Sequence, residues 1–317
     1  MNIHSLNSSV ATSTLVQREV ETEMKAERLC EDLERIIFET AALSDPVSIP
    51  NLILVARRVK NWVQPFFCRS VFISHSSSIP GHPRFTSEFI LKGISRQPPA
   101  FFSSNVRNLY IGYHFLGVNT VLGACSGVTE LFLNFGLLVN IAVLNRMSRL
   151  QRLTIEIDRL FSGRPVDFSI PLFQNLTHLE ILDGAGDRTV VQWRKIASLP
   201  NLTHLAFADP RFCPIFCEML KEWKRLKCLI LLTNATFQLE SLFAVEANGD
   251  LRFVISGPID FQLDWQKGVS GEGDYWEKAE EVIARKRAVK MHGELLLLHP
   301  CDKLEQCDAI ANMCHTT

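Results

Sequence analysis

One short apolar pattern recurs along the middle of the chain and constrains its fold more than any other feature. The pattern is apolar-x-x-apolar-x-apolar, and the first residues of its six clear copies are 22, 22, 26, 26 and 24 positions apart. These copies are Val106/Leu109/Ile111, Val128/Leu131/Leu133, Leu150/Leu153/Ile155, Leu176/Leu179/Ile181, Leu202/Leu205/Phe207 and Leu226/Leu229/Leu231. Weaker copies stand at Cys68/Val71/Ile73 and Asp250/Phe253/Ile255.

The repeated pattern predicts a parallel β-sheet to which each copy contributes one strand. Residues two apart in a strand point to the same side, so the second and third apolar positions of a copy share one buried face. A single strand cannot bury that face, whereas copies stacked side by side can. Parallel neighbours need a long return path, and helical patterns lie in the gaps between copies. We therefore expect an α/β fold with a parallel sheet and outer helices.

The spacing of the copies resembles that of the leucine-rich-repeat family, whose units run 20–29 residues. The resemblance covers residues 105–256 and implies a short solenoid whose strands line a concave side. The asparagine or cysteine that this family carries just beyond the third apolar position is mostly missing, although Asn134 and Asn234 lie near that place. We therefore expect the curvature of the solenoid to be irregular.

The N-terminal part of the chain has a helical texture instead. An amphipathic helix is predicted over 31–42, and a second helical stripe runs over 49–63. The phrase from Leu29 to Phe38 resembles the opening of the F-box, in which Leu-Pro precedes an acidic pair, a leucine and an Ile-Phe pair. Cys30 stands where that family has proline, a residue that pre-sets the first helical turn.

The stretch Leu52–Val59 is similar to the middle helix of the F-box, and Trp62 falls where the box often has an aromatic residue. Together with the repeats, the chain resembles F-box-like leucine-rich-repeat proteins, such as the F-box-like proteins of basidiomycete fungi. The resemblance implies that the first helix docks a Skp-type adaptor and, through it, a cullin. The residues that it assigns to adaptor binding are Leu33, Ile36, Ile37 and Phe38.

This resemblance implies the substrate-recognition adaptor of a cullin–RING (SCF-type) ubiquitin ligase. No catalytic residue is expected, because other subunits transfer ubiquitin in that family. The alternative is an interaction scaffold that uses the same repeat surface, has no ligase association, and keeps its F-box-like helices only as a cap on the first repeat. A hydrolase or metalloenzyme built on cysteines of the tail is a third class.

Side chains that alternate with the buried strand positions are expected to face a protein target, and they mix aromatic rings with both signs of charge. The predicted partner-binding residues are Tyr110, Glu130, Phe132, Arg152, Glu156, His178, Glu180 and His204. His178 and His204 occupy the same place in adjacent copies, and only Cys228 could add a third metal ligand beside them. We therefore expect no metal there, and imidazoles that lose their charge between about pH 6 and pH 8.

Composition and motifs exclude several classes of function. The formal net charge of −1 provides no overall attraction to nucleic acid, and no apolar run approaches the length of a membrane span. The odd number of cysteines, nine, favours reduced thiols in the cytoplasm or nucleus. The chain has no Gly-x-Ser-x-Gly or His-Glu-x-x-His motif. Cys301, Cys307, Cys314 and His315 lack the paired spacing of zinc sites, so neither metal nor cofactor is expected.

The domain organisation follows from these patterns. We expect a disordered N-terminal arm over 1–28, F-box-like helices over 29–70, a connector over 71–104 and the repeat region over 105–256. A C-terminal cap over 257–290 contains a helix whose apolar stripe covers the last repeat, as solenoid ends require. A partly disordered tail completes the chain over 291–317.

Overall fold

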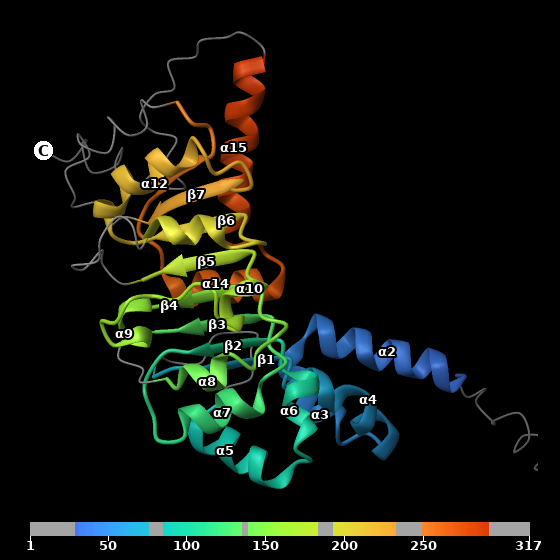
Figure 1. Ribbon diagram of the computed structural model, residues 1–317. Coiled ribbons are helices and arrows are strands. Elements are labelled where there is room, and N and C mark those ends of the chain that lie inside the picture. The colour runs from blue at the N-terminus through green and yellow to red at the C-terminus, as the bar shows by residue number, and fades with distance from the viewer. Residues whose placement is uncertain (1–28, 76–84, 135–138, 183–192, 233–248, 292–317) are drawn as a thin grey trace, which may run out of the picture. The chain divides into compact units, whose positions relative to one another are not determined.

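The computed structural model describes residues 29–75, 85–134, 139–182, 193–232 and 249–291 (Figure 1). The chain divides into two compact units, Met1–Phe67 and Cys68–Thr317. The expectations of a disordered arm over 1–28 and of a disordered tail lie outside the described residues, as do the cysteines of that tail.

The N-terminal unit is a group of short helices around a small core of its own. Its elements are α2 (Glu31–Ser44), η1 (Pro46–Ser48), α3 (Ile49–Leu52) and α4 (Arg57–Phe67). The core is formed by Ala42, Ile49, Val59 and Val63, with Phe38 and several other apolar residues packed around it. The unit therefore buries one face of α2.

The second helix predicted in this unit is wrong in its middle. The amides of Leu54 and Val55 bond to carbonyls three residues back, at 3.1 Å each, which tightens the chain into a turn between α3 and α4. Both side chains are exposed as a result. The helix α4 also continues through Pro65 to Phe67.

The C-terminal unit is built on an eight-stranded parallel sheet whose strand order follows the chain. The strands are β1 (Ser70–Ile73), β2 (Asn108–Ile111), β3 (Glu130–Leu133), β4 (Arg152–Ile155), β5 (His178–Ile181), β6 (His204–Phe207), β7 (Cys228–Leu232) and β8 (Phe253–Ser256). Equivalent residues of neighbouring copies are paired, for example Leu179 with Leu205. The predicted parallel sheet is therefore confirmed, and it begins at β1, inside the region expected to be a connector.

The apolar positions of the repeated pattern all face the interior of the unit. Leu109, Leu131, Leu153, Leu179 and Leu205 are at most 2% exposed, and so are the first positions of their copies. The connecting helices are α5 (Ser87–Arg96), α6 (Ala100–Asn105), α7 (Val118–Ala124), α8 (Ile141–Leu144), α9 (Ile157–Phe161), α10 (Pro171–Gln174), η2 (Lys195–Ser198), η3 (Pro210–Phe212) and α12 (Cys213–Leu220). These helices are short because each must fit into one return path between strands.

Side chains just before the strands tie each repeat to the one preceding it. The side-chain amide of Asn175 donates to the carbonyl oxygen of Ser148, and that of Asn201 donates to the carbonyl oxygen of Gln174, at 2.8 Å each. These asparagines precede the strand, so they do not occupy the position at which the leucine-rich-repeat family carries its asparagine. Each nonetheless satisfies a carbonyl that the preceding turn leaves without a partner.

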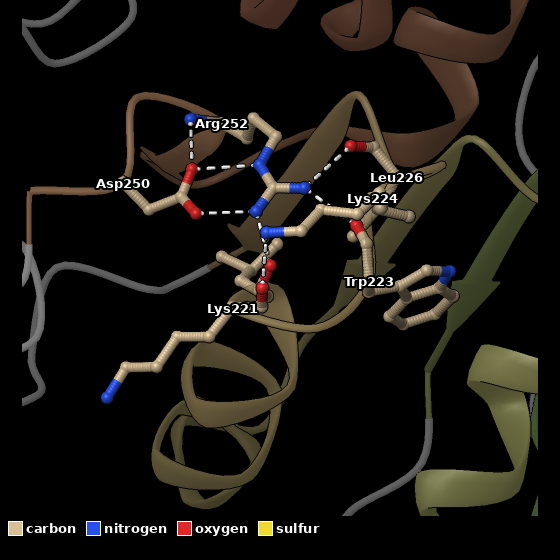
Figure 2. Close-up of polar contacts among 7 residues, drawn as sticks. Lys221, Trp223, Lys224, Leu226, Asp250 and Arg252 are labelled. Carbon is tan, nitrogen blue, oxygen red and sulfur yellow. Dashed lines mark hydrogen bonds and ion pairs between the residues drawn. The ribbon is translucent and has the colours of Figure 1, made fainter.

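At the C-terminal end of the sheet, the side chain of Arg252 binds the carbonyl oxygens of the preceding turn (Figure 2). The Arg252 guanidinium donates to the carbonyl oxygens of Trp223 at 2.7 Å, Leu226 at 3.1 Å and Leu220. It also pairs with the Asp250 carboxylate, and this hydrogen bond holds the pKa of Asp250 below its usual range. One side chain therefore closes the turn that follows α12.

Two helices follow the sheet and lie on the face opposite the connecting helices: α14 (Phe261–Ser270) and α15 (Tyr275–Met291). We call residues 261–291 the C-terminal strap. In the view of Figure 1, α14 passes behind the strands. The turn between the two helices uses Gly271 and Gly273, whose φ angles of 78° and 90° favour glycine.

The strap covers more of the sheet than the helix expected to cap the last repeat. The helix α15 does contact β7 and β8, but its Trp276 also reaches His178 in β5 and His204 in β6. The helix α14 packs Trp265 against Phe72 and Tyr110 of β1 and β2. The strap therefore covers the sheet from its first strand to its last.

Candidate functional site

Parallel pairing in register arranges the side chains of the strap-facing side of the sheet in two rows. One row is Ser70, Asn108, Glu130, Arg152, His178, His204 and Cys228, and the other is Phe72, Tyr110, Phe132, Thr154, Glu180, Ala206, Ile230 and Val254. Neighbours in a row are about 4.8 Å apart along the sheet. Seven of the eight predicted partner-binding residues belong to these rows, so the repeat pattern does bring them together.

The remaining predicted residue, Glu156, lies outside the rows because β4 ends one residue earlier. It precedes α9, and its carboxylate pairs with Arg159 at 2.7 Å. We conclude that Glu156 belongs to the turn after the strand.

An aromatic ladder forms the N-terminal part of the face. The ring centroids of Phe72 and Tyr110 are 4.5 Å apart, and those of Tyr110 and Phe132 are 4.2 Å apart. Trp265 meets Tyr110 edge-on at 5.3 Å, and Phe261 lies 6.2 Å from Phe132. Tyr110 and Phe132 are each 3% exposed. Burial raises the pKa of the Tyr110 hydroxyl, which stays protonated.

A cluster of carboxyl groups around one arginine forms the centre of the face. Arg152 Nη1 lies 2.7 Å from Asp274 Oδ2, and the side chain of Asp274 is only 5% exposed. The other oxygen of Asp274 accepts a hydrogen bond from the Glu277 amide at 3.0 Å, so this residue also caps α15. Asp274 therefore fixes both the start of α15 and its place on the sheet.

The neighbouring carboxyl groups have raised pKa values because they are buried. Burial raises the pKa of Glu130 to about 7, that of Glu180 to about 7 and that of Asp264 to about 6. The Thr154 hydroxyl donates to one Glu180 oxygen at 2.7 Å. Because Arg152 already pairs with Asp274, further negative charge here is costly.

Two stacked imidazoles come next along the row. The His178 and His204 rings are 4.1 Å apart at an angle of 6°, and the Trp276 ring stands edge-on to both. Burial lowers the pKa of His178 to about 2, and it lowers that of His204 despite the Glu280 carboxylate 2.9 Å from Nε2. The expectation that these imidazoles change charge between pH 6 and pH 8 is wrong, because the strap removes them from water.

The C-terminal part of the face is apolar. Cys228, Ile230 and Val254 pack against Val282 and Ile283 of α15. Burial raises the pKa of the Cys228 thiol to about 12, so it remains protonated at neutral pH. Within the described ranges, no group of three or more His, Cys, Asp or Glu side chains could hold a metal ion.

The expectation that this face is open to a partner is wrong in the structure, because the strap fills it. The cavity left beneath the strap measures about 20 Å³, which is room for about one water molecule. A cavity of about 440 Å³ lies elsewhere, where Arg194 pairs with Glu218, and none of the predicted site residues lines it. The residues predicted to bind a target therefore bind the chain's own C-terminus.

Sequence reasoning missed the residues that provide this cover. It places Asp264, Trp265, Asp274, Trp276 and Glu280 only in a cap over the last repeat. The available signal is the repeated acidic–aromatic pairing, Asp264-Trp265 and Asp274-Tyr275-Trp276, which the rows of the sheet complement.

The predicted adaptor-binding residues belong to the N-terminal unit. Leu33, Ile36 and Ile37 of α2 are 49%, 58% and 52% exposed, although they are large and apolar. Phe38 differs, because it packs against the core around Ala42. The first three therefore form an apolar surface, and Phe38 supports the helix from behind.

Comparisons with known proteins add nothing to these observations. No model of a protein family matches the sequence, and no curated protein matches it either. Among the helices that the structure describes, none combines the length and apolar character needed to cross a bilayer.

Proposed function

We propose that the chain is a substrate-recruiting adaptor of a cullin–RING ubiquitin ligase, with an F-box-like N-terminal unit and a short leucine-rich-repeat solenoid. The observation that carries the proposal is the exposed apolar surface of α2, formed by Leu33, Ile36 and Ile37. An isolated chain that leaves such side chains in water gains by covering them with a partner. A Skp-type adaptor is the partner that the F-box resemblance implies, and a cullin would follow through it.

The solenoid part of the proposal is supported by the copies at 22 to 26 residues and by their pairing in register. Solenoids of this kind use the strand-lined face to select a protein target. In this role the chain carries no catalytic residue, cofactor or metal, and it works in the cytoplasm or nucleus. The alternative role is an interaction scaffold without a ligase, in which the surface of α2 recruits no adaptor.

Co-purification of the full chain with a Skp-type adaptor distinguishes the two roles. We expect wild-type protein to retain the adaptor, and the double variant Leu33→Ser/Ile36→Ser to lose it. Because both side chains are about half exposed, the free energy of unfolding should change by no more than about 0.5 kcal/mol.

Leu263→Ser is the matched control, since Leu263 is 47% exposed but belongs to α14. It should retain the adaptor as the wild type does. Failure of the wild-type chain to bind the adaptor would favour the scaffold. Equal binding by the double variant would show that the adaptor does not dock on the exposed surface of α2, which contradicts the proposed site.

A further inference from the structure

We propose that the C-terminal strap is a displaceable occupant of the sheet face, and that the protein segment which replaces it carries a carboxylate beside a large aromatic side chain. This inference rests on the proposed function in one respect, because it assigns the replacing segment to the target that the adaptor recruits. The binding chemistry of the face is read from what now occupies it.

The strap offers two aromatic rings to the face, and a carboxylate beside one of them. Trp265 faces the aromatic ladder, where it packs on Phe72 and Tyr110, while the Asp264 carboxyl next to it accepts a hydrogen bond from the Tyr275 amide of the strap. Asp274 and Trp276 face the centre, where the carboxylate pairs with Arg152 and the indole meets both imidazoles. The face therefore contacts large aromatic rings at two places, and at the second of them it also pairs with a carboxylate.

Arg152 accounts for the carboxylate. Among the described residues of the two rows, it is the sole lysine or arginine, and the flanking residues are Glu130 and His178. Its partner Asp274 is almost entirely buried, so removing either residue would leave the other charge without a partner at the interface, which is unfavourable. A segment that displaces the strap must therefore bring a carboxylate to the same place.

The imidazole pair and the aromatic ladder account for the ring. The stacked imidazoles present their two ring edges side by side to Trp276, whose ring stands at 81° and 87° to them with centroids 5.1 Å and 5.9 Å away. An aliphatic side chain would fill the same volume without this ring–ring contact.

The way the strap is attached makes it displaceable. Among the described residues, no backbone–backbone hydrogen bond joins the strap to a strand, so side chains alone hold it. Three buried polar atoms of the strap have no hydrogen-bond partner in the described part of the chain: Trp265 Nε1 and both amide atoms of Gln266. Opening would expose them to water, which offsets part of the loss of contacts.

A labelled synthetic peptide of residues 272–288 of this chain tests the inference on the full-length protein. We expect weak binding to the wild type, because its own tethered strap competes at high effective concentration. The chain variant Asp274→Asn/Trp276→Ala weakens that competitor and should bind the peptide at least ten-fold tighter, as measured by fluorescence anisotropy. The asparagine introduced by the first change retains a side-chain oxygen that can cap α15.

Three controls show whether the peptide uses the proposed contacts. A peptide with the same two substitutions should bind neither protein. The chain variant Glu277→Gln/Glu281→Gln changes two exposed carboxylates of the same helix and should bind as the wild type does. Adding Arg152→Ala to the strap-weakened chain should abolish the gain in affinity.

The inference is overturned if the strap-weakened chain is folded by circular dichroism yet binds the peptide no better than the wild type. Hydrogen exchange on the wild type provides an independent readout, in which amides of α15 should exchange at least ten-fold faster than those of β5 and β6. Equal rates would mean that the strap opens only when the sheet unfolds, which also contradicts the inference. Adaptor co-purification is measured separately. If the ligase role is wrong, co-purification fails, whereas if the strap cannot be displaced, peptide binding fails.

Discussion

The helices α2 and α15 begin alike but have opposite fates. Each places an acidic residue in its first turn and carries apolar residues three or four positions apart, among them Leu33, Ile36 and Ile37 in α2 and Ala279, Val282 and Ile283 in α15. In α2 the side chains of Leu33, Ile36 and Ile37 remain about half exposed, whereas α15 buries Trp276 and Ile283 against the sheet. The difference teaches that an apolar stripe predicts a contact but does not tell whether the partner belongs to the same chain.

The physical reason lies in what each unit has available. The described helices of the N-terminal unit cover the Phe38 side of α2 but not the side that carries Leu33, Ile36 and Ile37. The sheet instead presents a wide face on which Trp276 of α15 meets His178 and His204, and Glu280 pairs with His204. Burial of a helix face therefore depends on a complementary surface within reach.

The largest expected difference between the two helices is the cost of removing an apolar side chain. Trp276→Ala should lower the free energy of unfolding by about 3–5 kcal/mol, because it leaves a cavity under the strap. Ile36→Ala should change it by no more than about 0.5 kcal/mol. Denaturation in urea measures both values. Similar costs for the two variants would show that α15 is no better packed than α2.

The ion pairs of the two regions should differ by a smaller amount. Arg35–Glu39 in α2 and Arg152–Asp274 under the strap are both 2.7 Å long, but the first is largely exposed and the second is not. Arg152→Ala should cost about 2–4 kcal/mol, since it leaves Asp274 buried without a counter-charge. Arg35→Ala should cost at most about 1 kcal/mol. A salt titration of both variants checks the assignment, because screening weakens the exposed pair more.

The smallest expected effect concerns pH. The pKa of Glu180 is raised to about 7 by burial, so the folded chain holds a proton that the unfolded chain releases above its ordinary pKa. This contribution to stability is fully present below about pH 4.5 and is lost as pH rises towards 7. Relative to Glu180→Gln, the wild type should therefore lose on the order of 1–2 kcal/mol between pH 5 and pH 8.

Melting curves of both proteins at the two pH values provide this measurement. His178, whose pKa is lowered to about 2, acts in the opposite direction and loses stability as pH falls below about 6.5. Its contribution is the same in both proteins and cancels in the difference. A difference that does not change between pH 5 and pH 8 would mean that Glu180 is ionised when buried.

The strands were predictable because burial on one face repeats at a fixed spacing. The six copies from Val106 onward identify six strands and their register. The cover of the other face was not predictable in the same way. Residues such as Glu130, Arg152 and His178 are polar and look solvent-exposed in a sequence, and only their pairing with a distant segment makes burial favourable.

Two local errors have similar causes. The turn between α3 and α4 carries apolar residues, Leu54 and Val55, so a helical stripe continues across it in the sequence although the chain turns there. Phe38 belongs to the same run as Ile36 and Ile37, and the pattern alone does not separate the buried face of α2 from the exposed one.

The position of the strap in the chain sets an order in time. Every strand that it covers precedes it, and the last strand, β8, ends at Ser256. A ribosome adds the 35 residues from 257 to 291 afterwards, which takes roughly 2–7 s at about 5–20 residues per second. During its own synthesis each molecule therefore completes the strands that the structure describes before the segment that covers them.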